Sequence, residues 1–189
     1  VGLLKPWAPS MDEGWTRWIL EQYGFAPKSL EPKAVQAGKL RSAFDAIILP
    51  DVGKTLLLEG RNRPEGQAGR RFTEELPPEY SGGLGRDGMK ALKAFVEEGG
   101  TLIALASSCE LLMDEWALPV RNALADGRGS EAFACPGSIL HVQLDPSHPV
   151  AFGMPAEAHA FVDERLAFQT LPASPQNRRA VVASYPEDA

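Results

Sequence analysis

Residues 99–112 read GGTLIALASSCELL, and this stretch decides the fold. Two glycines can end a preceding helix, and the apolar run TLIAL that follows is typical of a buried parallel strand. Small residues come next and permit a tight turn. Ser107 with Glu110 three residues later fits a capping box, so we expect a helix to begin there. The stretch therefore predicts a strand, a sharp bend and a helix, the arrangement in which α/β enzymes place a nucleophile at the carboxyl edge of the sheet.

The register of this bend decides whether a nucleophile stands on it. A nucleophile elbow needs small residues two positions before and two positions after the nucleophile, because the strained backbone leaves little room. Centring the pattern on Ala106 gives Ala104 and Ser108 as flanks, and both are small. Centring it on Ser107 or Cys109 puts a leucine at one flank. The better register therefore places an alanine, which cannot attack a substrate, at the nucleophile position.

The nearest thiol allows a competing interpretation. Cys109 is expected in the first helical turn, where the helix dipole can lower a thiol pKa. A small, half-buried residue is the simpler interpretation, and a small hydrolase or amidase using Cys109 is the alternative. The only other cysteine is Cys135. Two cysteines give neither a disulfide framework nor a zinc cluster, and the sequence leaves open whether they pair.

Composition limits the classes of protein to consider. The 189 residues are 44% hydrophobic and 23% charged, with a net charge of −6, which is ordinary for a globular protein. The length predicts a single domain over residues 1–189. The acidic charge disfavours a nucleic-acid partner, and no apolar run is long enough for a membrane span. The first residue is not a methionine, and Val1 opens a run that already reads as a strand, so we expect a fragment of a longer chain that begins upstream.

Apolar runs outline the central sheet. Residues 1–4, 44–49 and 101–105 are separated by helical patterns, and they predict adjacent parallel strands with helices on both faces. Residues 27–30 could add a short strand. Further along, residues 138–144 alternate in the manner of a half-buried strand.

The first predicted helix carries an aromatic stripe. Ser10 and Glu13 form a second capping-box pattern ahead of this helix. Apolar residues then follow at helical spacing: Trp15, Trp18, Ile19 and Tyr23. Packing of this stripe on the sheet is the favoured interpretation, and a sugar-stacking surface is the alternative.

Two segments outside the bend are candidates for binding. Asp51 follows the second predicted sheet strand, so it should stand at the carboxyl edge, where open α/β sheets bind ligands; capping of a helix over residues 52–58 is its favoured role. Residues 59–85 form a long loop that could be a flap or a mobile insertion. Its glycine-rich end, residues 80–85, could hold an anion, although a flexible helix entry is favoured.

The histidines provide no recognisable catalytic or metal pattern. His141, His148 and His159 lack the spacing of a zinc motif. His148 precedes a proline in a predicted turn, and His141 lies on the polar face of a predicted strand. The sequence therefore assigns no catalytic residue, no metal ligand and no cofactor to this chain.

Several separated blocks resemble a known family. They read SMDEGWTRWILEQYGF, FDAIILPD, PPEYSGGLG, LKAFVEEGGTLIAL, PVRN, CPGSIL, DPSHPVAFGMP and VVASYP. Together they resemble a class I glutamine amidotransferase-like domain, in particular the one on the carboxyl side of bacterial zinc carboxypeptidase-like proteins. The resemblance implies an α/β, flavodoxin-like three-layer sandwich with a mainly parallel central sheet. Such domains continue through one more strand and helix after VVASYP, so the resemblance implies that this fragment lacks its last elements.

The resemblance also implies a loss of chemistry. Active members resemble G-x-C-x-G at the elbow, whereas residues 104–108 read ALASS, with Ala106 in the cysteine position. A non-catalytic accessory role is therefore expected, either structural or in ligand binding. The resemblance places zinc in a companion N-terminal peptidase domain of the same chain, and the parent metallopeptidase would be secreted or periplasmic.

The superfamily's pocket could survive as a binding surface without chemistry. The helix start should leave free backbone amides at the sheet edge. A small polar or peptide ligand, or a segment of the peptidase domain, could occupy this space. The candidate ligand-binding residues are Asp51, Ala106, Ser107, Ser108, Cys109 and Glu110.

Overall fold

The chain divides into two compact units, residues 1–118 and 119–189, which are described separately. The expectation of a single domain over residues 1–189 stays a prediction. The computed structural model describes residues 1–60, 77–124, 137–162, 166–172 and 178–186.

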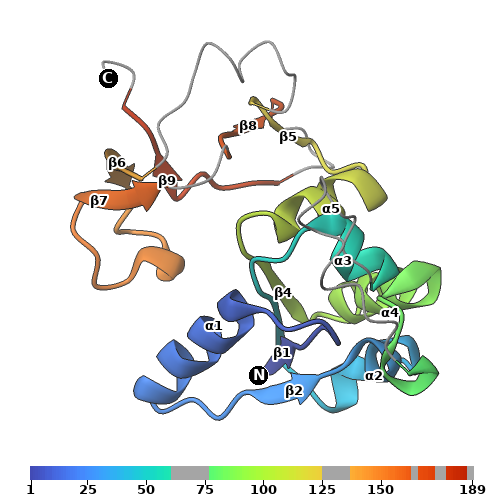
Figure 1. Ribbon diagram of the computed structural model, residues 1–189. Helices are drawn as coiled ribbons and strands as arrows, with labels where there is room; N and C mark the ends of the chain where they lie inside the picture. Colours follow the sequence, from blue (N-terminus) through green and yellow to red (C-terminus); the bar gives the residue numbers. More distant parts are fainter. Residues whose placement is uncertain (61–76, 125–136, 163–165, 173–177, 187–189) are drawn as a thin grey trace. The chain divides into compact units, whose positions relative to one another are not determined.

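A parallel four-stranded sheet forms the centre of the first unit (Figure 1). Its strands are β1 (Gly2–Leu4), β2 (Lys28–Leu30), β3 (Ala46–Leu49) and β4 (Thr101–Ala104), in the order β2-β1-β3-β4. Every neighbouring pair is parallel. The predicted adjacency of the three apolar runs is confirmed, and so is the α/β fold class.

Helices cover both faces of this sheet. The helices are α1 (Met11–Gln22), α2 (Pro32–Gln36), α3 (Lys54–Glu59), α4 (Gly85–Glu97) and α5 (Ser108–Glu115), with short 3₁₀ turns at Leu40–Ser42 and Pro78–Tyr80. The chain moves in one direction across the sheet through α1 and in the opposite direction through α2. Right-handed crossovers therefore put these two helices on opposite faces, as Figure 1 shows. Helix α1 covers one face, and α2 and α4 pack together on the other.

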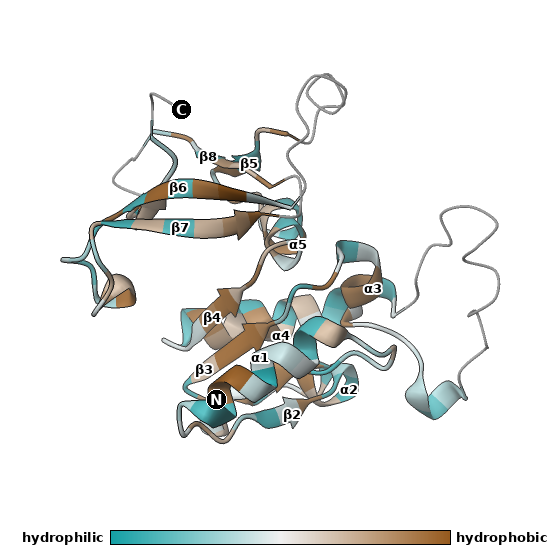
Figure 2. Ribbon diagram, turned by 60° about the vertical axis from the view of Figure 1, so that its left-hand side comes forward, coloured by the Kyte–Doolittle hydropathy of each residue, from teal (hydrophilic) through white to brown (hydrophobic). Residues whose placement is uncertain are grey.

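The main core lies between the sheet and the α2–α4 layer. Ile47 and Leu49 point into it from β3, and Leu92 and Phe95 enter from α4. The hydrophobic strands are visible in Figure 2. Gly100 allows a close approach here, because a Cβ atom at this position would lie 2.3 Å from the Phe95 ring. The second glycine of the GGTLIAL stretch is thus required by packing.

Helix α1 begins as predicted, but its predicted packing is wrong. The Ser10 hydroxyl accepts a hydrogen bond from the Glu13 amide at 3.2 Å, which confirms the N-cap. The aromatic stripe, however, faces away from the sheet: Trp15 is 60% exposed, Trp18 53%, Ile19 50% and Tyr23 80%. The inward face instead carries Glu13, which is only 9% exposed.

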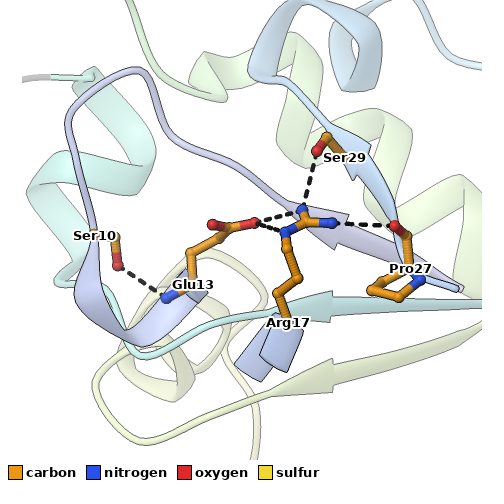
Figure 3. Close-up of polar contacts among 5 residues, drawn as sticks. All are labelled: Ser10, Glu13, Arg17, Pro27 and Ser29. Atoms are coloured by element: carbon orange, nitrogen blue, oxygen red, sulfur yellow. Dashed lines mark hydrogen bonds and ion pairs between the residues drawn. The ribbon is translucent and has the colours of Figure 1, made fainter. Parts of the chain in front are cut away.

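A charged network explains this orientation (Figure 3). The guanidinium of Arg17 donates to the Glu13 carboxylate at 2.5 and 3.0 Å. It also donates to the Pro27 carbonyl at 3.1 Å and to the Ser29 hydroxyl at 3.0 Å. Pro27 directly precedes β2, and Ser29 lies within it. Arg17 therefore connects α1 to this edge strand. Hydrophobic periodicity cannot identify an inward face that is held by a paired Arg and Glu.

The second unit contains antiparallel strands. β5 (Val120–Asn122) pairs with β8 (Phe168–Thr170), and β6 (Ser138–Leu144) lies between β7 (Glu157–Val162) and β9 (Ala183–Ser184). A 3₁₀ turn at Pro149–Ala151 lies between β6 and β7. The strand expected over residues 138–144 is confirmed. Within the described residues, no helix combines the length and the apolar character needed to cross a membrane.

Candidate functional site

The bend between β4 and α5 centres on Ala106. β4 ends at Ala104 and α5 begins at Ser108, so three residues reverse the backbone. Ala106 has φ = +43°, a left-handed conformation that costs an L-residue roughly 1–2 kcal/mol. Backbone strain of this kind is typical of a nucleophile elbow, and it falls at the position that the small flanks predict.

Ser108 stabilises the bend from within. Its side chain is fully buried, and its hydroxyl accepts a hydrogen bond from the Leu105 amide at 2.8 Å. The same oxygen lies 2.7 Å from the Leu105 carbonyl and 3.2 Å from the Leu49 carbonyl, either of which can accept the hydroxyl proton. The small side chain thus connects the bend to the end of β3. Contact between this hydroxyl and a ligand would require these bonds to break.

Asp51 lies at the same sheet edge, but its predicted capping role is wrong. α3 begins at Lys54 with Gly53 as N-cap and has no side-chain cap. The Asp51 carboxylate instead accepts a hydrogen bond from the Ser107 amide at 3.0 Å. β3 and β4 are neighbours with Leu49 opposite Ala104, so the residues that follow each strand meet at this edge.

The expectation of free amides at the start of α5 is also wrong. Ser107 occupies the N-cap position, which confirms the helix start, but its side chain makes no capping bond, so the predicted capping box with Glu110 does not form. The Ser107 amide donates to Asp51. The next three amides, of residues 108, 109 and 110, donate to backbone carbonyls of residues 105, 106 and 107 at 3.0, 3.0 and 3.2 Å. Because each of these donors is occupied, an anion finds no ready binding site here.

The thiol of Cys109 is half-buried and hydrogen-bonded. Its Sγ donates to the Ala104 carbonyl at 3.3 Å, and the thiol is free rather than in a disulfide. Burial raises the pKa of Cys109, and the neighbouring Asp51 and Glu110 carboxylates raise it further. The thiol therefore stays protonated at neutral pH, which makes it a weak nucleophile. Cys135 lies outside the described residues.

The glycine-rich segment before α4 is held by close backbone packing. The Leu84 amide donates to the Leu57 carbonyl at 2.7 Å, and a Cβ atom at Gly83 would lie 2.5 Å from the same carbonyl. Gln36 donates to the Gly83 carbonyl at 2.9 Å. This segment therefore fastens α4 to α3 and α2. Most of the predicted loop over residues 59–85, namely 61–76, lies outside the described residues.

All three histidines lie in the second unit. The His148 Nδ1 accepts a hydrogen bond from the Val150 amide at 3.3 Å, which confirms its role in a turn. His141 and His159 are cross-strand neighbours with ring centroids 5.7 Å apart, and His141 Nε2 lies 3.8 Å from the Glu157 carboxylate. Among the residues that the structure describes, no three or more His, Cys, Asp or Glu side chains are grouped so that they could hold a metal ion.

Comparison with known proteins identifies the fold but no family. A crystal structure from Thermoplasma acidophilum, provisionally identified as the A component of a GMP synthase, matches with a TM-score of 0.51 and 10% sequence identity. The match covers 97% of this chain and 71% of that one. No family model matches the sequence, and no curated protein does. The chain thus has a glutamine amidotransferase-like, flavodoxin-type fold.

Replacing the strained alanine tests the geometry of the bend. Ala106→Gly should raise the free energy of unfolding by about 0.5–1 kcal/mol, because glycine adopts positive φ without the Cβ penalty. Ala117→Gly should behave similarly, since Ala117 has φ = +48°. Ala34→Gly, at an exposed position of α2, is the matched control and should lower stability by about 1 kcal/mol. Urea unfolding provides the measurement. Equal losses in Ala106→Gly and Ala34→Gly would contradict an unfavourable backbone conformation at Ala106.

The reactivity of the thiol should depend on Asp51. Asp51→Asn removes a negative charge that raises the Cys109 pKa, so the pKa should fall and the thiolate fraction at pH 7.5 should increase. Alkylation by iodoacetamide should accelerate by less than about tenfold, since burial is the larger cause of the shift and one pKa unit corresponds to tenfold. Glu97→Gln on α4 is the control and should leave the rate unchanged. If the wild-type protein were alkylated faster than a free-thiol peptide, the interpretation of Cys109 as a weak nucleophile would be wrong.

Proposed function

We propose that this chain is a non-catalytic glutamine amidotransferase-like domain that serves a zinc carboxypeptidase-like protein as an accessory domain. One observation carries the non-catalytic part. An alanine occupies the elbow position, and the backbone amide that follows it donates to the Asp51 carboxylate.

Acyl transfer at such an elbow needs two groups, of which one is missing from this bend and the other is already bound. The first is a nucleophile, and the methyl group of Ala106 cannot supply one. The second is the amide after the nucleophile, which stabilises the oxyanion of the intermediate. That amide belongs to Ser107, and the carboxylate bound to it would repel an oxyanion at short range. Cys109 does not replace the nucleophile, because its pKa is raised and its Sγ is bound to a backbone carbonyl.

The charge of the edge indicates which ligands would fit it. The Asp51 carboxylate accepts a hydrogen bond at this edge and is close enough to Cys109 to raise its pKa, so a negative charge lies beside the bend. A hydrogen-bond donor such as an amide or an amine is therefore a better ligand than a carboxylate or a phosphate. This chemistry is compatible with a small polar ligand or a peptide segment that presents N–H groups.

The accessory role rests on the sequence resemblance to zinc carboxypeptidase-like proteins. The metal would belong to a companion peptidase domain, because this chain offers no motif for it. On this proposal, the edge of the amidotransferase-like sheet holds a segment of the peptidase domain or of its substrate. The fold is then retained for its surface and its stability.

Restoring the missing nucleophile should not restore chemistry. Wild type and Ala106→Cys should both fail to hydrolyse glutamine or a p-nitrophenyl ester above the rate of a Cys109→Ser control, which keeps Ala106 at the elbow. The introduced thiol would still lack an available oxyanion donor. Stability should change little in Ala106→Cys, because alanine already bears the Cβ penalty at this φ. Glutamine hydrolysis by wild type that Cys109→Ser abolishes would instead establish the alternative, a hydrolase that uses Cys109.

The accessory role can be tested in the parent polypeptide. The kcat of zinc-dependent carboxypeptidase activity should be unaffected by Cys109→Ser, because the proposal assigns the thiol no chemistry, and Glu97→Gln on α4 is the control away from this edge. Removal of this domain should raise KM or lower the thermal midpoint of the peptidase, since a binding or supporting surface is lost. A zinc-binding HxxE motif upstream would agree with the proposal. A parent without peptidase activity, or one that loses nothing when the domain is deleted, would contradict it.

A further inference from the structure

The outer face of α1 is an apolar seam that the first unit leaves exposed. Its most exposed members are Met11, at 79%, and Tyr23, at 80%, and the two tryptophans lie between them. Trp15 and Trp18 pack edge to face with ring centroids 6.0 Å apart. The helix cannot turn this face inward, because the network of Arg17 with Glu13, Pro27 and Ser29 fixes the opposite face on the sheet.

The spacing of the seam is that of helix pairing. Met11, Trp15 and Trp18 are separated by four and three residues, which is the alternation of core positions in a two-helix seam. They therefore form a row along the helix, whereas Glu13, Arg17 and Leu20 form the inward row. A stripe with 3-4 spacing is best covered by another helix, which can present a matching row of side chains.

The charges beside the seam are acidic. Four residues flank the seam, namely Asp12, Gly14, Ile19 and Glu21, at positions where helix pairs place residues that select a partner. The two charged ones, Asp12 and Glu21, are acidic and exposed. None of the ion pairs within the described residues involves either carboxylate. The single basic residue of α1 is Arg17, which is directed inward. The exposed face of α1 therefore combines apolar side chains with uncompensated negative charge.

We propose that this seam binds an amphipathic helix of a partner protein, with apolar residues at matching 3-4 spacing and Lys or Arg on its flanks. Basic flanks would face Asp12 and Glu21, so opposite charges meet at the rim of the contact. A second copy of the same helix is disfavoured, because the basic residue of α1, Arg17, is directed inward and cannot supply the complementary charge. This inference is independent of the bend at Ala106 and of the carboxypeptidase proposal.

A pair of designed peptides tests the seam. Both carry a leucine seam at 3-4 spacing; one has Lys at the flanking positions and the other has Glu. Fluorescence anisotropy of the labelled peptides, titrated with the whole 189-residue chain, should show roughly tenfold tighter binding of the Lys peptide at low salt, with a smaller difference at 0.5 M NaCl. Trp15→Ser/Trp18→Ser should weaken this binding at least tenfold, while the midpoint of urea unfolding changes little because both side chains are exposed.

Charge reversal provides the specific control. Asp12→Lys/Glu21→Lys should transfer the preference to the Glu peptide. Glu97→Lys/Glu98→Lys, on the exposed end of α4, makes the same change in net charge and should leave the preference for the Lys peptide intact. Equal binding of both peptides would overturn the proposal, and so would absence of binding up to about 1 mM, a free energy near −4 kcal/mol.

Two other occupants of the seam are distinguishable. Self-association in sedimentation that Trp15→Ser/Trp18→Ser abolishes would identify a second copy as the occupant and overturn the proposal. Protection of both tryptophans from acrylamide quenching in the monomer, with no peptide bound, would show that another part of the same chain covers the seam, which would overturn it too. We expect acrylamide to quench the tryptophan fluorescence of the free monomer, and we expect the Lys peptide to reduce this quenching when it binds.

Discussion

The hydrogen bond between the Asp51 carboxylate and the Ser107 amide joins the ends of β3 and β4. The backbone reverses within three residues and places Ala106 at positive φ, so the bend needs support on both sides. On the interior side, the Ser108 hydroxyl supports the bend through hydrogen bonding to the carbonyls of residues 49 and 105. Asp51 supports the bend from the edge. Both contacts run between β3 and β4, and the bend is therefore fixed by the pairing of these strands.

The same contact changes the chemical character of the edge. In an active elbow the amide after the nucleophile is kept for the oxyanion of an intermediate. Here that donor binds the protein's own Asp51 carboxylate. Burial raises the pKa of the Cys109 thiol, and the negative charge of Asp51 raises it further. An interaction that stabilises the bend thus also opposes nucleophilic chemistry at it. Retention of the turn without its reactive group is the physical basis of the proposed non-catalytic role.

The orientation of α1 follows from a different constraint. The Arg17 guanidinium makes four hydrogen bonds. Two go to Glu13 of the same helix, and the other two go to the Pro27 carbonyl and the Ser29 hydroxyl on the side that faces β2. Turning the tryptophans inward would separate Arg17 from the Pro27 carbonyl and the Ser29 hydroxyl, while its pair with Glu13 on the same helix would persist. The polar network therefore leaves the aromatic residues on the outer surface. The bend and the outer face of α1 are consequently separate features, held by separate contacts of the first unit.

The sequence by itself determined the parallel sheet, the adjacency of its three apolar runs, the bend and its register on Ala106, because periodicity and side-chain size act locally. The strand of residues 138–144 and the Ser10 N-cap were predictable for the same reason. Tertiary structure alone decided that Asp51 binds the Ser107 amide, 56 residues away, rather than capping its own helix. It also decided that α1 packs through Glu13 and Arg17. Hydrogen bonds between distant residues have no periodic signature, so only the folded chain shows which groups they bring together.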